Sequence, residues 1–148
     1  MKEKVLEVLK NLGFNCEELD DWGYGFKYEG ASYFYIPNED DDEFLSLCVP
    51  GIQDFEEDNA SLFYQWVDKL NTMFKYVKAH KVGDSMWLFY ERECIGEEED
   101  LRAVITRMIY HLEASLFLAR KVFAAEEGET TDGEANDPDV DETTEDND

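Results

Sequence analysis

The side chains most often used for catalysis near neutral pH are few in this sequence. Only two histidines occur, His80 and His111, and neither has the neighbours typical of a general base. Cys16, Cys48 and Cys94 are widely spaced and form no CxxC pair. We therefore expect no disulfide framework and no thiolate zinc site, and a reducing cytoplasm is the compartment that these cysteines fit.

Carboxylates are abundant, and the run Asn38–Glu43 contains five consecutive ones. This run lacks the regular ligand spacing and the glycine of an EF-hand loop, so we predict no metal site. Phosphate-binding loops, the zinc-protease motif and the nucleophile elbow of serine hydrolases are also absent from the sequence. We expect no cofactor and no enzymatic activity.

The charge balance excludes further classes of function. The 148 residues carry 37 acidic and 13 basic side chains, for a formal net charge of −24. Nucleic acids and anionic lipids are bound by Lys and Arg, so we predict neither a nucleic acid nor a membrane as partner. No apolar run approaches the length of a membrane-spanning helix.

The acidity is most concentrated at the C-terminus. Residues 126–148 contain twelve acidic side chains and no Lys, Arg or aromatic residue. Such a segment buries too little apolar surface to offset the entropy of ordering it. We predict a single domain over residues 1–125 and a disordered acidic tail over 126–148, which either keeps the protein in solution or docks onto a basic partner.

Hydrophobic periodicity predicts the elements that must position any site. A spacing of three to four residues indicates helices, and strict alternation indicates strands. The order is α-β-β-β-α-β-β-α, with a long last helix. The predicted elements are a helix at 2–12, strands at 22–28, 31–36 and 44–49, a helix at 59–74, strands at 76–82 and 85–92, and a helix at 97–124.

Short turns join these strands and fix the fold class. Glu29-Gly30 and Gly83-Asp84 have the positions of two-residue hairpin turns. Pro50-Gly51 is expected to end the third strand. Strands joined in this way pair antiparallel, and the helices must cover one face of their sheet. We predict an α+β fold with a five-stranded antiparallel sheet.

The hairpin turns also predict which side chains share a face of the sheet. Alternation places Leu45, Leu47 and Val49 with the aliphatic residues of the second hairpin, facing the helices. The opposite face would then be rich in rings, a composition typical of recognition surfaces. The alternatives are a second core layer or a slipped register. The candidate partner-binding residues on this face are Tyr24, Phe26, Tyr33, Tyr35, Phe44, Trp87 and Phe89.

The second helix with Leu70-Asn71, the strand with Trp87-Leu88-Phe89-Tyr90 and the final helix from Leu101 through Val122 resemble a known pattern. In their order they resemble the type III secretion chaperone-like fold and, within it, the YbjN-like bacterial proteins. The resemblance covers residues 1–125. It implies a small, non-enzymatic cytoplasmic protein, often a homodimer, that holds segments of other polypeptides. It assigns no role to any individual residue.

Three functional hypotheses follow. The first is a chaperone-like or regulatory binding module that holds an apolar segment of a partner polypeptide on the aromatic surface. The second is a small regulator that responds to a ligand or metal ion bound between sheet and helices. The third is an acidic mimic of nucleic acid that depends on the tail. A homodimer is left open.

Overall fold

The computed structural model describes the backbone of residues 1–132 and the side chains of residues 1–125. The remainder of the predicted tail, residues 133–148, lies outside the described residues. The chain divides into two compact units, Met1–Leu116 and Phe117–Asp148. The predicted single domain over residues 1–125 stays a prediction.

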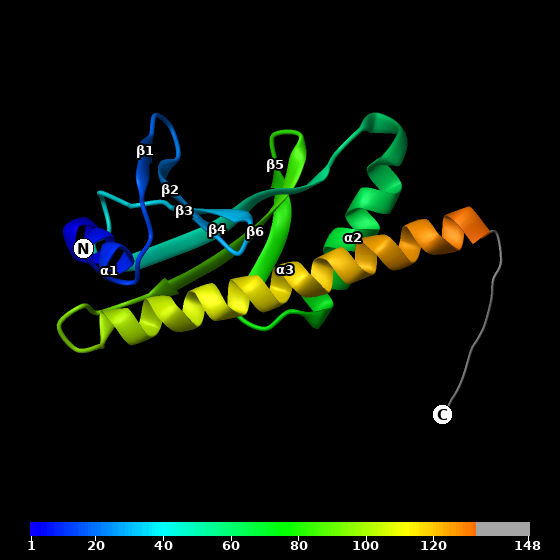
Figure 1. The fold of residues 1–148 in the computed structure, drawn as a ribbon. Helices are drawn as coiled ribbons and strands as arrows, with labels where there is room; N and C mark the ends of the chain where they lie inside the picture. The colour runs from blue at the N-terminus through cyan, green and yellow to red at the C-terminus, as the bar shows by residue number, and fades with distance from the viewer. Residues whose placement is uncertain (133–148) are drawn as a thin grey trace, which may run out of the picture. The chain divides into compact units, whose positions relative to one another are not determined.

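Among the described residues, the strands form one six-stranded antiparallel sheet in the order β1-β2-β3-β4-β6-β5 (Figure 1). The α+β class is confirmed. The elements are α1 Lys2–Asn11, β1 Glu17–Leu19, β2 Gly23–Tyr28, β3 Ala31–Tyr35, β4 Phe44–Asp54, the 3-10 helix η1 Glu57–Asn59, α2 Ala60–Met73, β5 Val77–Val82, β6 Ser85–Glu93 and α3 Leu101–Asp132.

The prediction of a five-stranded sheet is wrong in the number of strands and in the end of the third predicted strand. The edge strand β1 was missed because its three residues are too few to show alternation. The expected end of the third strand at Pro50-Gly51 is also wrong, because β4 continues to Asp54. Its pairing with β6 shifts in register between Val49 and Gln53, and Gly51 within this interval has φ +58°. Pro50 and Gly51 thus mark a bulge within β4 and not its end.

The last helix begins at Leu101 rather than at residue 97. The preceding residues form a turn in which the N–H groups of Glu98 and Glu99 donate to the carbonyl of Ile95. Asp100 then accepts a hydrogen bond from the N–H of Ala103 at 3.3 Å. The helix runs to Asp132, past the predicted end at residue 124, so its backbone includes the first part of the predicted tail.

Both predicted hairpin turns are confirmed. Glu29 and Gly30 have φ values of +51° and +81°, as a two-residue turn between twisted strands requires. The pairs Tyr24↔Tyr35 and Phe26↔Tyr33 follow from it as predicted. In the second hairpin, Val82 pairs with Ser85 across the turn.

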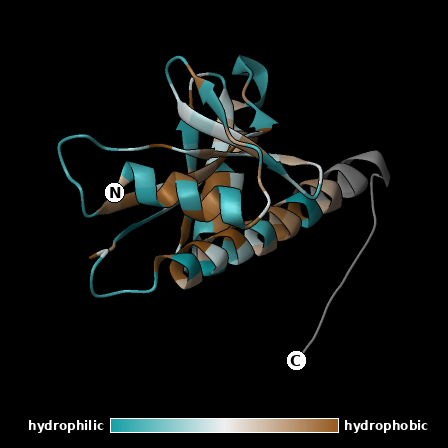
Figure 2. Ribbon diagram, turned by 60° about the vertical axis from the view of Figure 1, so that its left-hand side comes forward, coloured by the Kyte–Doolittle hydropathy of each residue, from teal (hydrophilic) through white to brown (hydrophobic). Residues whose placement is uncertain are grey.

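One face of the sheet, the covered face, packs against helices. Tyr35 pairs with Leu47, which pairs with Tyr90, so these side chains project to the same side. The Phe14 ring, just after α1, lies 4.7 Å from that of Phe26, and His111 of α3 lies 6.1 Å from Tyr90. Figure 2 shows hydrophobic segments alternating with hydrophilic ones along α1 and the first half of α3, and hydrophilic colouring on several loops.

The β5 edge of the sheet is closed by a side chain. The Asn71 amide nitrogen donates to the carbonyl of Ala79 at 2.9 Å, and its oxygen accepts from the N–H of Ala79 at 2.7 Å. Asn71 therefore bonds to the middle of β5 as a neighbouring strand would, and it fixes α2 beside the edge.

Candidate functional site

The opposite face of the sheet, the far face, carries a second hydrophobic cluster. Phe34 pairs with Cys48, which pairs with Phe89, and this row alternates with the covered-face row of Tyr35 and Leu47. Cys48, Trp87 and Phe89 are at most 8% exposed. The side chains packed around these three are Phe34, Ile36 and Val82.

Aromatic rings from two strands, β3 and β6, and from one loop connect this cluster. Trp87 lies at its centre, with ring centroids 4.8 Å from Trp22, 5.7 Å from Phe34 and 6.0 Å from Phe89. The Trp87 indole N–H donates to the Ser85 hydroxyl at 3.0 Å, which fixes the ring and satisfies its polar atom. We call Trp22, Phe34, Ile36, Val82, Trp87 and Phe89, with Cys48 beneath them, the far-face cluster.

Trp22 is the exposed member of the far-face cluster. It lies in the loop between β1 and β2 and exposes 42% of its surface although its ring contacts Trp87. The next residue, Gly23, has φ +83°, and a Cβ there would collide with the carbonyl oxygen of Tyr35. Glycine at this position therefore allows the close approach that carries Trp22 over the far face.

Polar groups surround the far-face cluster. The Lys78 ammonium lies 3.0 Å from the Glu91 carboxylate, and the Ser46 hydroxyl lies 3.5 Å from the second oxygen of the same group. The His80 ring stacks on Phe89 at 4.5 Å. An apolar centre with a polar rim is the usual composition of a binding surface.

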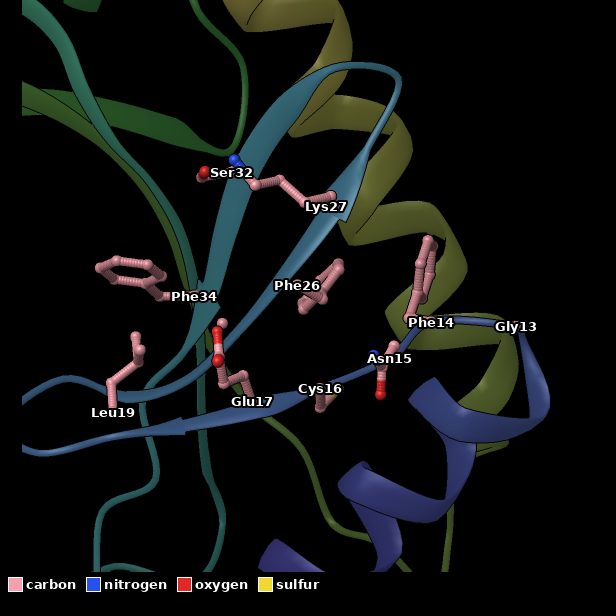
Figure 3. A pocket seen from close by; sticks show the side chains of 11 residues that line it. Gly13, Phe14, Asn15, Cys16, Glu17, Leu19, Phe26, Lys27, Ser32 and Phe34 are labelled. Atoms are coloured by element: carbon pink, nitrogen blue, oxygen red, sulfur yellow. The ribbon is translucent and has the colours of Figure 1, made fainter.

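A hollow of about 670 Å³ adjoins the cluster (Figure 3). Leu19 and Phe34 stand at one end of it, and Phe14 lies at the other. Gly25 leaves space at its floor, since a Cβ there would lie 3.2 Å from Leu19 and 3.4 Å from Phe34. Phe34 belongs to both the hollow and the cluster, so the two form one continuous surface. The remaining lining residues are Gly13, Asn15, Cys16, Glu17, Phe26, Lys27 and Ser32.

The expectation that all seven candidate rings share one uncovered face is wrong. Phe26, Tyr33 and Tyr35 are at most 3% exposed and lie on the covered face. Tyr24 shares their side of the hairpin and is half-buried, and Phe44 is half-buried at the start of β4. Only Trp87 and Phe89 belong to the far-face cluster. Relative to the predicted alignment, the first hairpin is shifted by one residue against the second. A shift of one residue moves every side chain of a strand to the opposite face of the sheet.

The structure instead brings Trp22, Phe34, Ile36 and Val82 into the cluster, which the sequence interpretation missed. Gly23 and Gly25 alternate with Tyr24 and Phe26 along β2. Side chains are absent at those glycines, so neighbouring rings have room above them. These glycines were the signal in the sequence that could have indicated the side of the hairpin on which the cluster forms.

The three cysteine thiols have raised pKa values, so their ionisation to the reactive thiolate is disfavoured. Burial, with a smaller effect from Glu91, raises the pKa of the Cys48 thiol to about 12. Burial also raises the pKa of the Cys16 thiol, and it is the largest cause of the raised pKa of Cys94. A thiol with a raised pKa is a poor nucleophile. The absence of enzymatic activity stays a prediction.

The part of the chain between residues 1 and 132 also bears on metal binding and on membrane insertion. Within this range, no three His, Cys, Asp or Glu side chains are grouped so as to hold a metal ion. The helices there are too polar or too short to cross a membrane.

No family model and no curated protein matches this sequence. A match is found among solved structures, with the crystal structure of YbjN from E. coli, a protein proposed to regulate transcription. The TM-score is 0.63 at 9% sequence identity, and the match covers 85% of this chain and 93% of that one. The chain has a YbjN-like fold. The comparison supports that part of the expected resemblance and does not bear specifically on type III secretion chaperones.

Proposed function

We propose that the chain is a non-enzymatic binding module, of regulatory or chaperone type, that holds an apolar segment of a partner polypeptide on the far-face cluster. The observation that carries this proposal is Trp22, which stays 42% exposed while contacting the otherwise buried Trp87. An exposed tryptophan packed against a desolvated cluster is a typical anchor of a polypeptide interface.

The surroundings of the cluster favour a polypeptide over other partners. A row of rings across adjacent strands matches the alternate side chains of an extended segment. The exposed carboxylates of Glu17, Glu18, Asp20 and Asp21 lie beside the Trp22 loop and disfavour anionic partners. The free thiols of the chain fit a reducing cytoplasm, and the fold similarity to YbjN fits a regulatory module.

The test begins with peptides selected from a phage-displayed library on the immobilised full-length chain. Selected peptides are then synthesised, and their dissociation constants are measured by fluorescence anisotropy. We expect sequences with large apolar residues at alternate positions. Trp22→Ala should weaken their binding by about 2 kcal/mol, the usual loss at a central anchor.

Tyr64→Ala is the matched control, because Tyr64 is a comparable ring on α2 that is 52% exposed. It should bind the selected peptides as the unsubstituted chain does. Equal affinities of the Trp22→Ala variant and the unsubstituted chain, with both folded by circular dichroism, would contradict the proposal. So would failure of the library to yield any apolar sequence.

A second candidate function rests on the hollow beside Phe34. Its volume of about 670 Å³ falls within the range of small-molecule sites. A ligand bound there would make the chain a ligand-responsive regulator. Thermal unfolding against a library of metabolites and divalent cations tests this function, since a ligand at a hundredfold excess over its dissociation constant adds about 2.7 kcal/mol of stability. An unchanged melting temperature throughout would exclude it for the compounds tested.

A further inference from the structure

The exposed side of α3 differs in charge from the rest of this acidic chain. Between Leu101 and Ala125 the sequence has four basic side chains and one carboxylate, Glu113, in contrast to the four consecutive carboxylates of residues 97–100 directly before this stretch. Within the unit Met1–Leu116, the basic residues of α3 are Arg102 and Arg107, and both are exposed. Such a patch in a chain of net charge −24 singles out a surface with its own electrostatic preference.

The two arginines are arranged for an external partner. Arg102, Thr106 and Tyr110 follow one another at intervals of four residues, so they form one row along the helix. Arg107 lies one turn before Tyr110 on its other side. Among residues 1–125 neither arginine makes an ion pair, whereas Lys78 and Arg92 are paired with Glu91 and Glu99.

The positive charge of Arg107 affects the pKa of a neighbouring side chain, His111. Burial lowers the pKa of His111, and the positive charge of Arg107 lowers it further. His111 is therefore neutral near pH 7 and does not add to the local charge. The guanidinium groups are the positive charges that this side of the helix presents.

An apolar pocket of about 330 Å³ opens beside the same row. Tyr110, which is 61% exposed, forms part of its wall. The one carboxylate in the pocket, Glu113, accepts a hydrogen bond from the Tyr28 hydroxyl, and its charge raises the pKa of that phenol. The other lining residues are Leu12, Phe14, Thr106 and Ile109.

We propose that this α3 surface binds an acidic amphipathic polypeptide segment. A large apolar side chain of the segment fills the pocket beside Tyr110, and flanking Asp or Glu residues pair with Arg102 and Arg107. This site is separate from the far-face cluster, so it gives the chain a second and chemically opposite specificity.

The same chemistry distinguishes a polypeptide from a nucleic acid. Two guanidinium groups neutralise few phosphates, and the remaining charge of the chain repels a polyanion. A short acidic segment carries less charge, and its apolar residues use the pocket, which a phosphate backbone cannot. The arginines and the pocket together therefore favour the acidic polypeptide.

The test uses three fluorescein-labelled peptides that alternate Leu or Phe with Asp and Glu, with Asn and Gln, or with Lys. Anisotropy is measured with the full-length chain at low and at physiological ionic strength. We expect the acidic peptide to bind most tightly and to lose affinity as salt rises. Replacing both arginines with alanine should weaken it about tenfold, because each exposed ion pair contributes modestly.

Tyr110→Ala should also weaken the acidic peptide, through the pocket. Tyr64→Ala and Lys69→Ala on α2 are matched exposed controls and should not change its affinity, nor should Trp22→Ala, which affects only the far-face cluster. Equal binding of the acidic and amide peptides would overturn the proposal. Arginine-dependent binding of a DNA duplex that exceeds binding of the peptide would overturn it in favour of nucleic acid, and a dimer that the double arginine variant dissociates would overturn it in favour of self-association.

Discussion

The two faces of the sheet carry the same kinds of ring, but only one of them is covered by helices. On the covered face, Tyr33 and Tyr35 are almost fully buried. On the far face, Phe34, between those two tyrosines in the chain, stays partly exposed. Ring content therefore does not identify a binding surface. What identifies it is whether the side chain of a strand residue points toward the helices or away from them.

Leu47→Ala should have the largest effect of the substitutions considered. Leu47 lies on the covered face with no exposed surface, so its truncation should lower the free energy of unfolding by about 3 kcal/mol. Urea denaturation followed by circular dichroism measures this change. Cys48→Ala, its neighbour on the far face, is the matched control and should cost about 1 kcal/mol. Equal losses of unfolding free energy in the Leu47→Ala and Cys48→Ala variants would contradict the distinction between the two faces.

Phe34→Ala should have an intermediate effect. Its ring contacts Trp87 at 5.7 Å but remains partly exposed, so the free energy of unfolding should fall by about 2 kcal/mol. Fluorescence should also report the change, because Trp87 loses a neighbouring ring and becomes more hydrated. A loss as large as that of Leu47→Ala would show that the far face is as closed as the covered one.

Asn71→Ala should lower the free energy of unfolding by about 1 to 2 kcal/mol, because Ala79 loses both of its side-chain hydrogen bonds. This sharpens the comparison, since Asn71 fastens α2 at the β5 edge, which both faces of the sheet share. Thr72→Ala is the control. The Thr72 hydroxyl bonds only within its own helix, to the carbonyl of Asp68, and its loss should change the urea midpoint little.

The smallest expected effect on stability near neutral pH comes from two ionisable side chains, one on each face of the sheet. Burial is the main cause that raises the pKa of both the Tyr35 phenol and the Cys48 thiol to about 12. Both groups ionise at lower pH when the chain unfolds, because the ordinary pKa values are 10.0 for the phenol and 9.0 for the thiol. Their stabilisation is thus complete below the unfolded pKa and is lost as pH rises from about 9 toward 12.

Urea midpoints at about pH 8 and about pH 11 measure this loss. Cys48→Ala should remove the part of the decline that starts near the thiol pKa of the unfolded chain. A midpoint that stays constant over this interval would show that one or both groups are hydrated in the folded protein.

Local patterns predicted much of the fold because the information for them lies in neighbouring residues. Glu29-Gly30 and Gly83-Asp84 each fixed the register of a hairpin, and Gly13 with φ +99° lies just after the first helix as predicted. The alignment of one hairpin with the other was wrong, because it depends on the pairing of β3 with β4. That pairing joins only Phe34↔Cys48 and Tyr35↔Leu47, and no turn specifies it.

The candidate site was predicted in part for the same reason. Trp87 and Phe89 were placed correctly relative to their own hairpin, and they belong to the far-face cluster. Trp22 was treated as the start of a strand, although it lies in a loop whose path depends on the contact of Gly23 with Tyr35. A close approach between segments distant in sequence leaves no periodic signal.

The amide of Asn71 also limits how copies of this protein can assemble side by side. Strands of two molecules can pair laterally only at an edge whose central N–H and C=O groups are open, and on β5 those of Ala79 are occupied. A strand of another copy would therefore meet an occupied residue at the middle of β5, whereas β1 forms the opposite edge of the sheet. The side-chain amide thus gives the β5 edge a local protection against strand addition of the kind that sheet edges generally need.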